Sequence, residues 1–127
     1  MNVAGIGMDL VEVERARLIL DRFGERAMRR FLTDREQAYV RERADPAPHF
    51  AVRVAAKEAA YKALQSLPGM REVSWHDLEV SRNPEGRPRL LLHGPAAAVA
   101  PGHELHLSLT HTRTVAGAVA VLSRLTP

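Results

Sequence analysis

The segment from His49 to Leu64 constrains the fold of this chain most strongly. It is rich in alanine and contains neither glycine nor proline, and alanine has the highest helix propensity of all residues. We therefore predict a helix over this range. The helix before it should end ahead of Asp45, Pro46 and Pro48, because proline cannot continue a helical hydrogen-bond ladder.

Three further elements are predicted upstream. Val3–Leu10 is short, apolar and punctuated by glycine, which is typical of a strand, with Asp9 at its end. Between Val11 and Arg30, apolar residues recur at steps of three and four, which indicates a helix that Gly24 can interrupt. The run Thr33–Glu36 has the spacing of a capping box, so a second helix should start there.

The second half of the chain has the pattern of strands. We predict them at Trp75–Val80, Arg89–Leu92, Leu105–Thr110 and Val115–Leu122. Asn83–Gly86 is typical of a turn between the first two, and the alanines after Pro95 predict a short helix. Helices early and strands late indicate an α+β fold, with an antiparallel sheet packed against a long helix, as a single domain over residues 1–127.

The composition narrows the class of protein. With 127 residues, of which 46% are hydrophobic and 26% charged, the chain fits one globular domain. The lack of cysteine excludes disulfides and thiolate metal sites. No stretch approaches the roughly 20 apolar residues that span a bilayer, and the first residues do not resemble a secretion signal. We expect a cytoplasmic protein without a membrane partner.

The positive charge is unevenly composed. A net charge of +3 permits an anionic partner without naming one. The only two lysines, Lys57 and Lys62, stand on either side of Glu58. A compact ammonium and a planar guanidinium are not equivalent at a crowded site. The pair of lysines therefore indicates a chemical role, with chance as the alternative.

Glu58 and Lys62 are four residues apart and so share one face of the predicted helix. Ala51 and Ala55 continue this row, and their small side chains would let another backbone approach closely. The alternative is an exposed Glu–Lys pair of the ordinary stabilising kind.

Asp9 and Glu58 together form a candidate magnesium site. Magnesium takes one or two protein carboxylates and fills its other positions with phosphate oxygens and water. The alternative for Asp9 is that it caps the next helix. Gly5 and Gly7 do not make a dinucleotide-binding motif, because the third glycine is replaced by Leu10.

The histidines carry a weaker signal. His111 follows a predicted strand, where a histidine is more often structural than functional. His103, His106 and His111 lack the glutamate and the spacing of a zinc-binding helix.

Arginines recur along the first predicted helix. Arg15, Arg22, Arg26 and Arg29 follow steps of seven, four and three residues and so form one basic stripe. Such a run is usually a solvated face. The excess of positive charge is one-sided here, which favours docking to an acidic partner.

Three motifs follow one another along the chain. They are Gly5-Ile6-Gly7-Met8-Asp9, Arg53-Val54-Ala55-Ala56-Lys57-Glu58-Ala59-Ala60-Tyr61-Lys62 and Leu107-Ser108-Leu109-Thr110-His111-Thr112. Together they resemble the holo-acyl-carrier-protein synthases of the 4'-phosphopantetheinyl transferase superfamily. Val52 and Val54 depart from the glycine and phenylalanine common in that family, and Gln65–Gly69 departs from its glycine-rich turn.

The resemblance implies the fold and the reaction of that superfamily. The 4'-phosphopantetheine arm of coenzyme A would be transferred to a serine of an apo acyl carrier protein, with release of 3',5'-ADP, in support of fatty acid or polyketide biosynthesis. Asp9 and Glu58 would bind Mg²⁺ and, with Lys62, carry the catalysis. The residues implied to bind the coenzyme are Arg53, Lys57, Lys62, Ser108 and His111.

The resemblance also implies partners. Arg15, Arg22 and Arg26 would meet the acidic recognition helix of the carrier protein, and the chain would form a homotrimer with its sites between subunits. For the proton of the serine hydroxyl, Glu58 and a metal-bound hydroxide are both candidate acceptors.

Two other classes of protein compete with this interpretation. A nucleic-acid-binding protein would fit the basic stripe, but three Phe, two Tyr and one Trp do not form a stacking platform with the arginines, so we expect no nucleic-acid partner. A non-catalytic carrier-protein-binding subunit would keep the fold without the chemistry, and the substitution Glu58→Gln distinguishes it from an enzyme.

Overall fold

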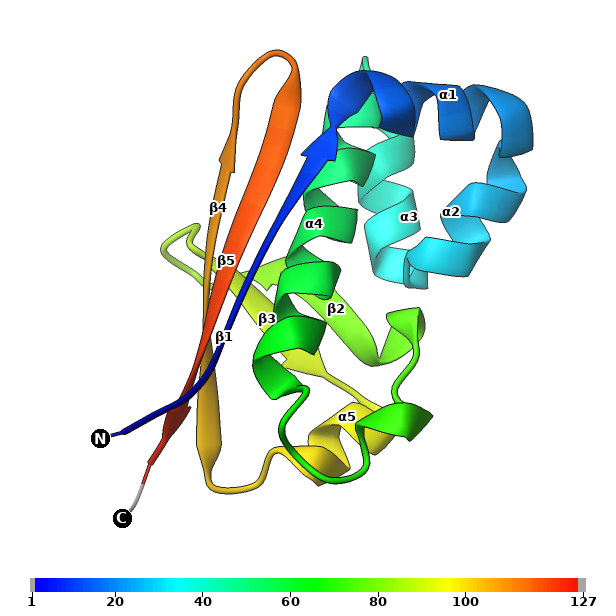
Figure 1. The fold of residues 1–127 in the computed structure, drawn as a ribbon. Coiled ribbons are helices and arrows are strands. Elements are labelled where there is room, and N and C mark those ends of the chain that lie inside the picture. The colour runs from blue at the N-terminus through cyan, green and yellow to red at the C-terminus, as the bar shows by residue number, and fades with distance from the viewer. Residues whose placement is uncertain (1, 126–127) are drawn as a thin grey trace.

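A long central helix separates a three-stranded sheet from a group of shorter helices (Figure 1). The structure is a computed structural model and describes residues 2–125. In chain order its elements are β1 (Asn2–Glu12), α1 (Val13–Phe23), α2 (Glu25–Phe31), α3 (Asp34–Arg41), α4 (Pro46–Leu64), the 3₁₀ turns η1 (Met70–Glu72) and η2 (Trp75–Asp77), β2 (Leu78–Arg82), β3 (Pro88–Leu92), α5 (Gly94–Val99), β4 (His103–His111) and β5 (Val115–Arg124).

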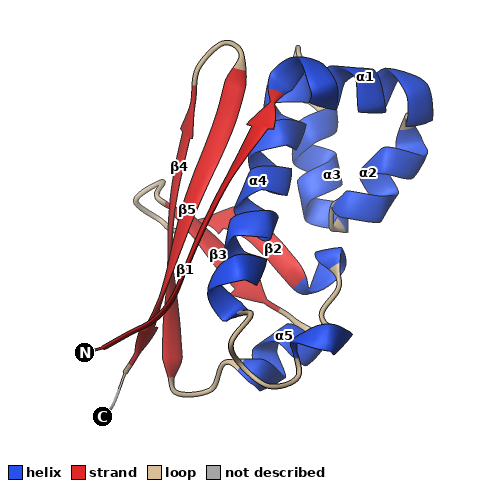
Figure 2. Cartoon of the chain, viewed as in Figure 1, coloured by secondary structure: helices blue, strands red, loops and turns tan. Residues whose placement is uncertain are grey.

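The larger sheet has the strand order β1-β5-β4 and is antiparallel throughout. The first and last strands are neighbours in it, with Asn2 opposite Arg124 and Glu12 opposite Val115. Strands β2 and β3 form a separate antiparallel pair. The predicted antiparallel sheet against a long helix is confirmed, and Figure 2 shows β1, β4 and β5 on one side of α4 and α1, α2 and α3 on the other.

The long helix begins earlier than predicted. It starts at Pro46, and its N-cap Asp45 accepts a hydrogen bond from the backbone N–H of Ala47 at 3.4 Å. The prediction that Pro46 and Pro48 lie outside this helix is wrong. The first N–H groups of a helix have no acceptor within it, so proline is tolerated in the first turn.

The N-terminal strand is longer than predicted. It continues to Glu12, which stands at the N-cap of α1. Asp9 therefore lies inside the strand and does not end it, and the alternative in which Asp9 caps the next helix is excluded. The interruption at Gly24 is confirmed, since this residue has φ of 53° between α1 and α2.

Two other boundaries test the sequence patterns. The capping box is confirmed, because the backbone N–H of Glu36 donates to Thr33 Oγ1 at 3.3 Å and Thr33 N–H donates to Glu36 Oε1 at 2.8 Å. The strand predicted from Trp75 starts only at Leu78, because Trp75–Asp77 form a 3₁₀ turn.

Helix α4 is buried on most of its circumference. Its alanines fill the space toward both the sheet and the shorter helices, so that α4 contributes to two core clusters. Leu78, Leu90 and Leu122 pack in one cluster, and Val13 and Phe50 in the other. Of the helices formed by residues 2–125, none combines the length and hydropathy that crossing a bilayer requires.

Candidate functional site

Gly5 and Gly7 let β1 run directly against α4. A Cβ atom on Gly7 would lie 1.8 Å from the carbonyl oxygen of Ala59, and one on Gly5 would lie 2.0 Å from that of Ala63. Because alternate residues of a strand share a face, Asp9 faces the helix as the two glycines do. A close approach of a backbone was predicted for the row of Ala51, Ala55, Glu58 and Lys62, but the structure has it at Ala59 and Ala63.

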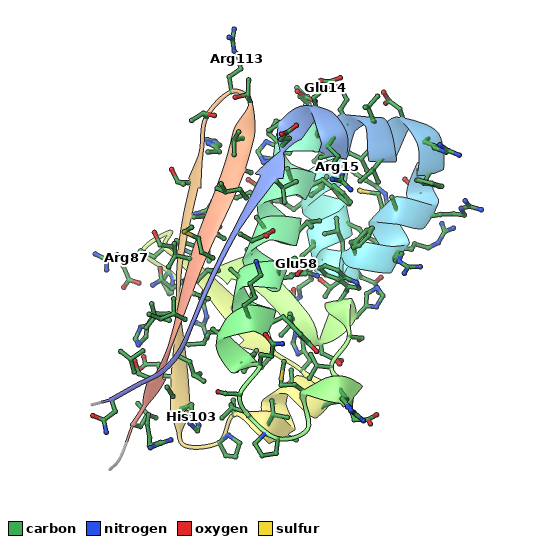
Figure 3. All side chains as sticks on the ribbon, viewed as in Figure 1. Glu14, Arg15, Glu58, Arg87, His103 and Arg113 are labelled. Atoms are coloured by element: carbon green, nitrogen blue, oxygen red, sulfur yellow. The ribbon has the colours of Figure 1, made fainter. Side chains whose placement is uncertain are left out.

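Asp9 meets the helix at Lys62. The ammonium nitrogen of Lys62 lies 3.4 Å from Asp9 Oδ1 and donates a hydrogen bond to the carbonyl oxygen of Met8 at 3.0 Å. Glu58 is one turn earlier on the same face of α4 and is half-buried (Figure 3). The structure thus places Asp9 against Lys62, one helical turn after Glu58, and the shared site of Asp9 and Glu58 stays a prediction.

The carboxylates of Asp9 and Glu58 are donors that fit a magnesium ion. Within residues 2–125, no group of three His, Asp or Glu side chains is arranged to hold a metal ion. Magnesium needs only one or two carboxylates when phosphate oxygens and water complete its shell. Asp9, with 22% of its side chain exposed, and Glu58 can supply these two oxygen donors on a solvent-accessible surface.

A cavity of about 610 Å³ opens elsewhere on the chain. Arg53 and His111, both predicted to bind the coenzyme, line it together with Arg35 and Arg82. Arg53 and Glu58 are five residues apart on α4, so their directions differ by about 140° around the helix axis. The two groups of predicted site residues therefore face different sides of a single chain.

Arg53 is held tightly in that cavity. Its guanidinium carbon lies over the ring of Tyr39, 4.3 Å from the ring centre, and its Nη1 donates to the carbonyl oxygen of His49 at 3.1 Å. Burial lowers the pKa of Arg53, which is 8% exposed. The sequence patterns missed Tyr39, and no local signal could have found it, because its contact with Arg53 arises from the packing of α3 on α4.

Lys57 lies in the core. Its ammonium group is fully buried, pairs with Glu36 at 2.6 Å, and donates to the carbonyl oxygens of Phe31 at 2.7 Å and Trp75 at 3.0 Å. An ammonium has three N–H donors, and these three acceptors engage them all. The geometry gives Lys57 a structural role, and its predicted contact with the coenzyme stays a prediction that this arrangement does not favour.

Ser108 is separated from the cavity. Leu107 and Leu109 pack on the core, so Ser108 projects from the opposite face of β4, and in the register it stands beside Val119 of β5. The structure does not bring Ser108 together with Arg53 and His111 in one chain.

The same outer face of the sheet is apolar along β1 and at Val119, whereas on β4 it carries polar residues such as His106 and Ser108. Along β1, the side chains of Ile6, Met8 and Leu10 are 64%, 59% and 65% exposed, and Val119 on β5 is also exposed. We call these four residues the outer sheet patch. Strand alternation places them on the side opposite Gly5, Gly7 and Asp9.

The basic stripe spans two helices. Arg15 and Arg22 belong to α1 and Arg26 to α2, because Gly24 separates the helices, and all three are exposed. The guanidinium groups of Arg22 and Arg26 lie 5.4 and 5.6 Å from the ring of Phe23, which is 41% exposed. Figure 3 shows Arg15 on α1.

Known proteins resemble this chain over nearly its whole length. The holo-[acyl-carrier-protein] synthase of Koribacter versatilis is 45% identical over 124 residues, which cover 94% of this chain and 98% of that protein. The crystal structure of the synthase from Bacillus anthracis, in complex with CoA (3',5'-ADP), is 34% identical, with a TM-score of 0.78 and coverage of 95% and 96%.

A second solved structure agrees in fold. The synthase from Neisseria meningitidis is 26% identical, with a TM-score of 0.82, and the match covers 96% of this chain and 99% of that one. The model of the 4'-phosphopantetheinyl transferase superfamily matches residues 5–120. By this match and the identity to its relatives, the chain belongs to the 4'-phosphopantetheinyl transferase superfamily, on the branch of the holo-[acyl-carrier-protein] synthases.

Proposed function

We propose that this chain performs the holo-[acyl-carrier-protein] synthase reaction at a site built from Asp9, Glu58 and Lys62. The serine oxygen of an apo acyl carrier protein forms a bond to the phosphorus that carries the pantetheine arm of coenzyme A. The bond from that phosphorus to the bridging oxygen breaks, 3',5'-ADP leaves, and the serine proton passes to a base. The contact between Lys62 and Asp9 carries this assignment of residues.

Each residue of the site has a role that its geometry supports. Asp9 and Glu58 would hold Mg²⁺, which when bound neutralises charge on the diphosphate and on the departing nucleotide. Lys62 extends from the next turn of the helix after Glu58 and is 47% exposed, so its ammonium can donate to diphosphate oxygens. An oxygen of Glu58 can accept the serine proton.

In our proposal the coenzyme extends from this site to the cavity around Arg53 and His111 of a neighbouring copy of the chain. Both side chains line that cavity, and guanidinium groups bind phosphate oxygens in two-point hydrogen bonds. Lys57 contributes by holding α4 in place through Glu36. For Ser108, a coenzyme contact requires a second copy of the chain.

A homotrimer with sites between subunits would bring the metal ligands of one copy next to the Arg53 cavity of another. The outer sheet patch offers an apolar surface of the kind that subunit interfaces cover. One copy would contribute Asp9 and Glu58, and its neighbour would contribute Arg53 and His111. In a cyclic assembly each interface pairs unlike surfaces of the two copies.

Mixing two inactive variants tests the shared site. Subunits with Glu58→Gln keep the Arg53 cavity, and subunits with Arg53→Leu keep the metal ligands. After the two are unfolded together and refolded in equal amounts, about a quarter of the sites combine both intact halves, and activity returns to that level. Recovery of no activity would contradict the shared site.

The acidic helix of the carrier protein would dock on Arg15, Arg22 and Arg26. These side chains are exposed and carry no acidic partner within hydrogen-bond distance among the described residues. A one-sided positive surface steers a negatively charged protein toward the site. A cytoplasmic location remains part of this proposal.

Mass measurement of the carrier protein tests the reaction. Apo carrier protein is incubated with coenzyme A, Mg²⁺ and this protein, and gains the mass of one phosphopantetheine. The gain disappears with a chelator and with Glu58→Gln, but persists with Glu85→Gln in the exposed β2–β3 turn. An unchanged gain with Glu58→Gln would contradict the assignment, and no gain with the unmodified protein would identify a non-catalytic binder.

A further inference from the structure

The ring of Tyr39 on α3 contacts two guanidinium groups. The central carbons of Arg43 and Arg53 each lie 4.3 Å from the centre of this ring. The ring of His49 meets the Tyr39 ring at an interplanar angle of 69°, with 5.8 Å between centroids. Cations within about 6 Å of an aromatic face are attracted by its negative quadrupole. One aromatic side chain thus organises the cationic groups at the start of α4.

These contacts concentrate positive charge. Arg53 is almost fully buried, and burial together with the guanidinium groups of Arg53 and Arg43 lowers the pKa of His49. Arg35 and Arg82 line the same cavity. Like charges so close together repel one another unless an anion joins them.

The carboxylates of the cavity offset this charge only in part. The charge of Glu36 opposes the effect of burial on the pKa of Arg53, but its oxygens are engaged by Lys57, at 2.6 Å, and by the backbone N–H of Val80. Glu79 accepts from or pairs with His93 at 2.7 Å. These interactions direct the carboxylates to groups other than Arg53. The cavity is therefore prepared for an anionic ligand.

The position of Arg53 over the Tyr39 ring leaves hydrogen-bond donors of its guanidinium group available. The N–H bonds of a guanidinium lie in its plane, so a contact through its face occupies none of them. Nη1 of Arg53 donates to the carbonyl oxygen of His49, and the buried Nε has no hydrogen-bond partner among residues 2–125. A buried donor without an acceptor is costly, and a ligand anion can remove that cost.

We propose that Tyr39 is a positioning residue, whose ring fixes the guanidinium group of Arg53 so that its edge is presented to the anionic groups of the coenzyme. The inference rests on the proposed function, in which Arg53 binds the coenzyme. Tyr39 acts through its face and needs no hydroxyl group for this. A ring that served only to fill the core would affect stability and leave coenzyme affinity unchanged.

The test compares two substitutions at this position. Tyr39→Phe keeps the aromatic face, and Tyr39→Leu removes it. Binding of 3',5'-ADP is measured by calorimetry, and kcat and KM are measured for coenzyme A and for the carrier protein. We expect Tyr39→Phe to stay within about twofold of the unmodified protein, and Tyr39→Leu to weaken 3',5'-ADP binding and raise the KM for coenzyme A about tenfold. The kcat and the KM for the carrier protein should change little.

Arg53→Leu separates this inference from the proposed function. If Tyr39 acts through Arg53, the double variant Tyr39→Leu/Arg53→Leu binds 3',5'-ADP no more weakly than Arg53→Leu alone. If Arg53→Leu weakens binding but Tyr39→Leu does not, the role of Tyr39 is refuted and the cavity assignment stands. If Arg53→Leu leaves coenzyme binding unchanged, the cavity assignment itself fails.

A further variant guards against loss of the fold. Should Tyr39→Leu unfold the protein, Tyr39→Met supplies an apolar side chain of similar length without an aromatic face. A folded Tyr39→Met protein with weakened 3',5'-ADP binding supports the inference, and one with unchanged binding overturns it.

Discussion

The ammonium group of Lys62 on α4 lies 3.4 Å from Oδ1 of Asp9 on β1. This contact joins the two segments that carry the proposed metal ligands. It is possible because Gly5 and Gly7 have no side chains to hold the strand away from the helix. The placement of the site therefore depends on the packing of one strand on one helix.

Gly7→Ala should destabilise the fold and impair the site. The new Cβ would lie 1.8 Å from the carbonyl oxygen of Ala59 and 2.9 Å from the backbone nitrogen of Ala63, so the strand must move away from the helix. Overpacking of this kind costs about 2–3 kcal/mol of unfolding free energy. Urea unfolding measures the loss, and the transfer rate should fall because Asp9 moves with β1.

Gly117→Ala is the matched control in the same sheet. There the new Cβ would lie 3.0 Å from Cδ2 of Leu10 and 3.3 Å from Cγ2 of Thr110. These atoms end side chains that can rotate, so the cost should stay below about 1 kcal/mol. Equal destabilisation by the two substitutions would contradict the special closeness of β1 and α4 at Gly7.

Lys57 should contribute mainly to the stability of the fold, and Lys62 mainly to transfer activity. Lys57→Met leaves the buried carboxylate of Glu36 without its ion pair and should lower the unfolding free energy by about 3–5 kcal/mol. Lys62→Met removes a half-exposed side chain and should change stability by less than about 1 kcal/mol, while transfer activity falls steeply. The contrast is measured by urea unfolding and by carrier mass. A stable Lys57→Met protein would contradict the structural role.

Asp45→Asn should make stability less dependent on pH. The Asp45 carboxylate accepts two hydrogen bonds from Arg17, at 2.7 and 3.0 Å, and this pairing lowers the pKa of Asp45. The folded protein then binds fewer protons than the unfolded chain, so the stabilisation is present above the ordinary value of 3.8 and is lost as the pH falls through it toward the lower folded pKa.

Melting temperatures across this pH range check the effect. The difference between the unmodified protein and Asp45→Asn should be largest near neutral pH and should shrink in acid, because protonated Asp45 also loses its charge pairing with Arg17. Little difference should then remain, since the amide of Asn can still cap α4. A difference that does not change with pH would show that Arg17 and Asp45 do not stabilise the folded state by charge.

Arg15→Glu together with Arg22→Glu should raise the KM for the carrier protein by about tenfold or more and leave the KM for coenzyme A nearly unchanged. Both side chains are exposed on α1, away from the coenzyme cavity. Arg87→Glu together with Arg89→Glu, at two exposed positions of the β2–β3 hairpin, is the control with the same number of charge reversals (Figure 3 shows Arg87). Equal increases in both KM values would mean that the stripe is not the docking surface.

Local patterns were sufficient for much of the fold. The capping box of Thr33 and Glu36, the break at Gly24 and the alanine-rich helix all depend on neighbouring residues, and all are confirmed. Because of the prolines at positions 46 and 48, the start of α4 was predicted too late, at His49 instead of Pro46. Proline is excluded from a helix interior but tolerated in its first turn, and the pattern alone did not distinguish the two cases.

Contacts between distant elements could not be predicted in the same way. Asp9 and Glu58 were predicted as metal ligands because carboxylates suit magnesium, and the role of Lys62 was predicted from the family resemblance. The partners of Lys57 and Arg53 were missed, since Glu36 and Tyr39 come from α3, and no spacing in the sequence relates that helix to α4. Gly5 and Gly7 were recognised as an incomplete nucleotide motif and as part of the family resemblance, whereas the structure gives them a packing role.

Calorimetric titration of Mg²⁺ into the protein with bound coenzyme A, without carrier protein, tests the shared ion most directly. We predict that Asp9→Asn and Glu58→Gln each weaken Mg²⁺ binding by about tenfold or more, and that the double variant binds little worse than either single one, because both carboxylates hold the same ion. Unchanged Mg²⁺ affinity in either single variant, or losses that simply add in the double variant, would contradict the account.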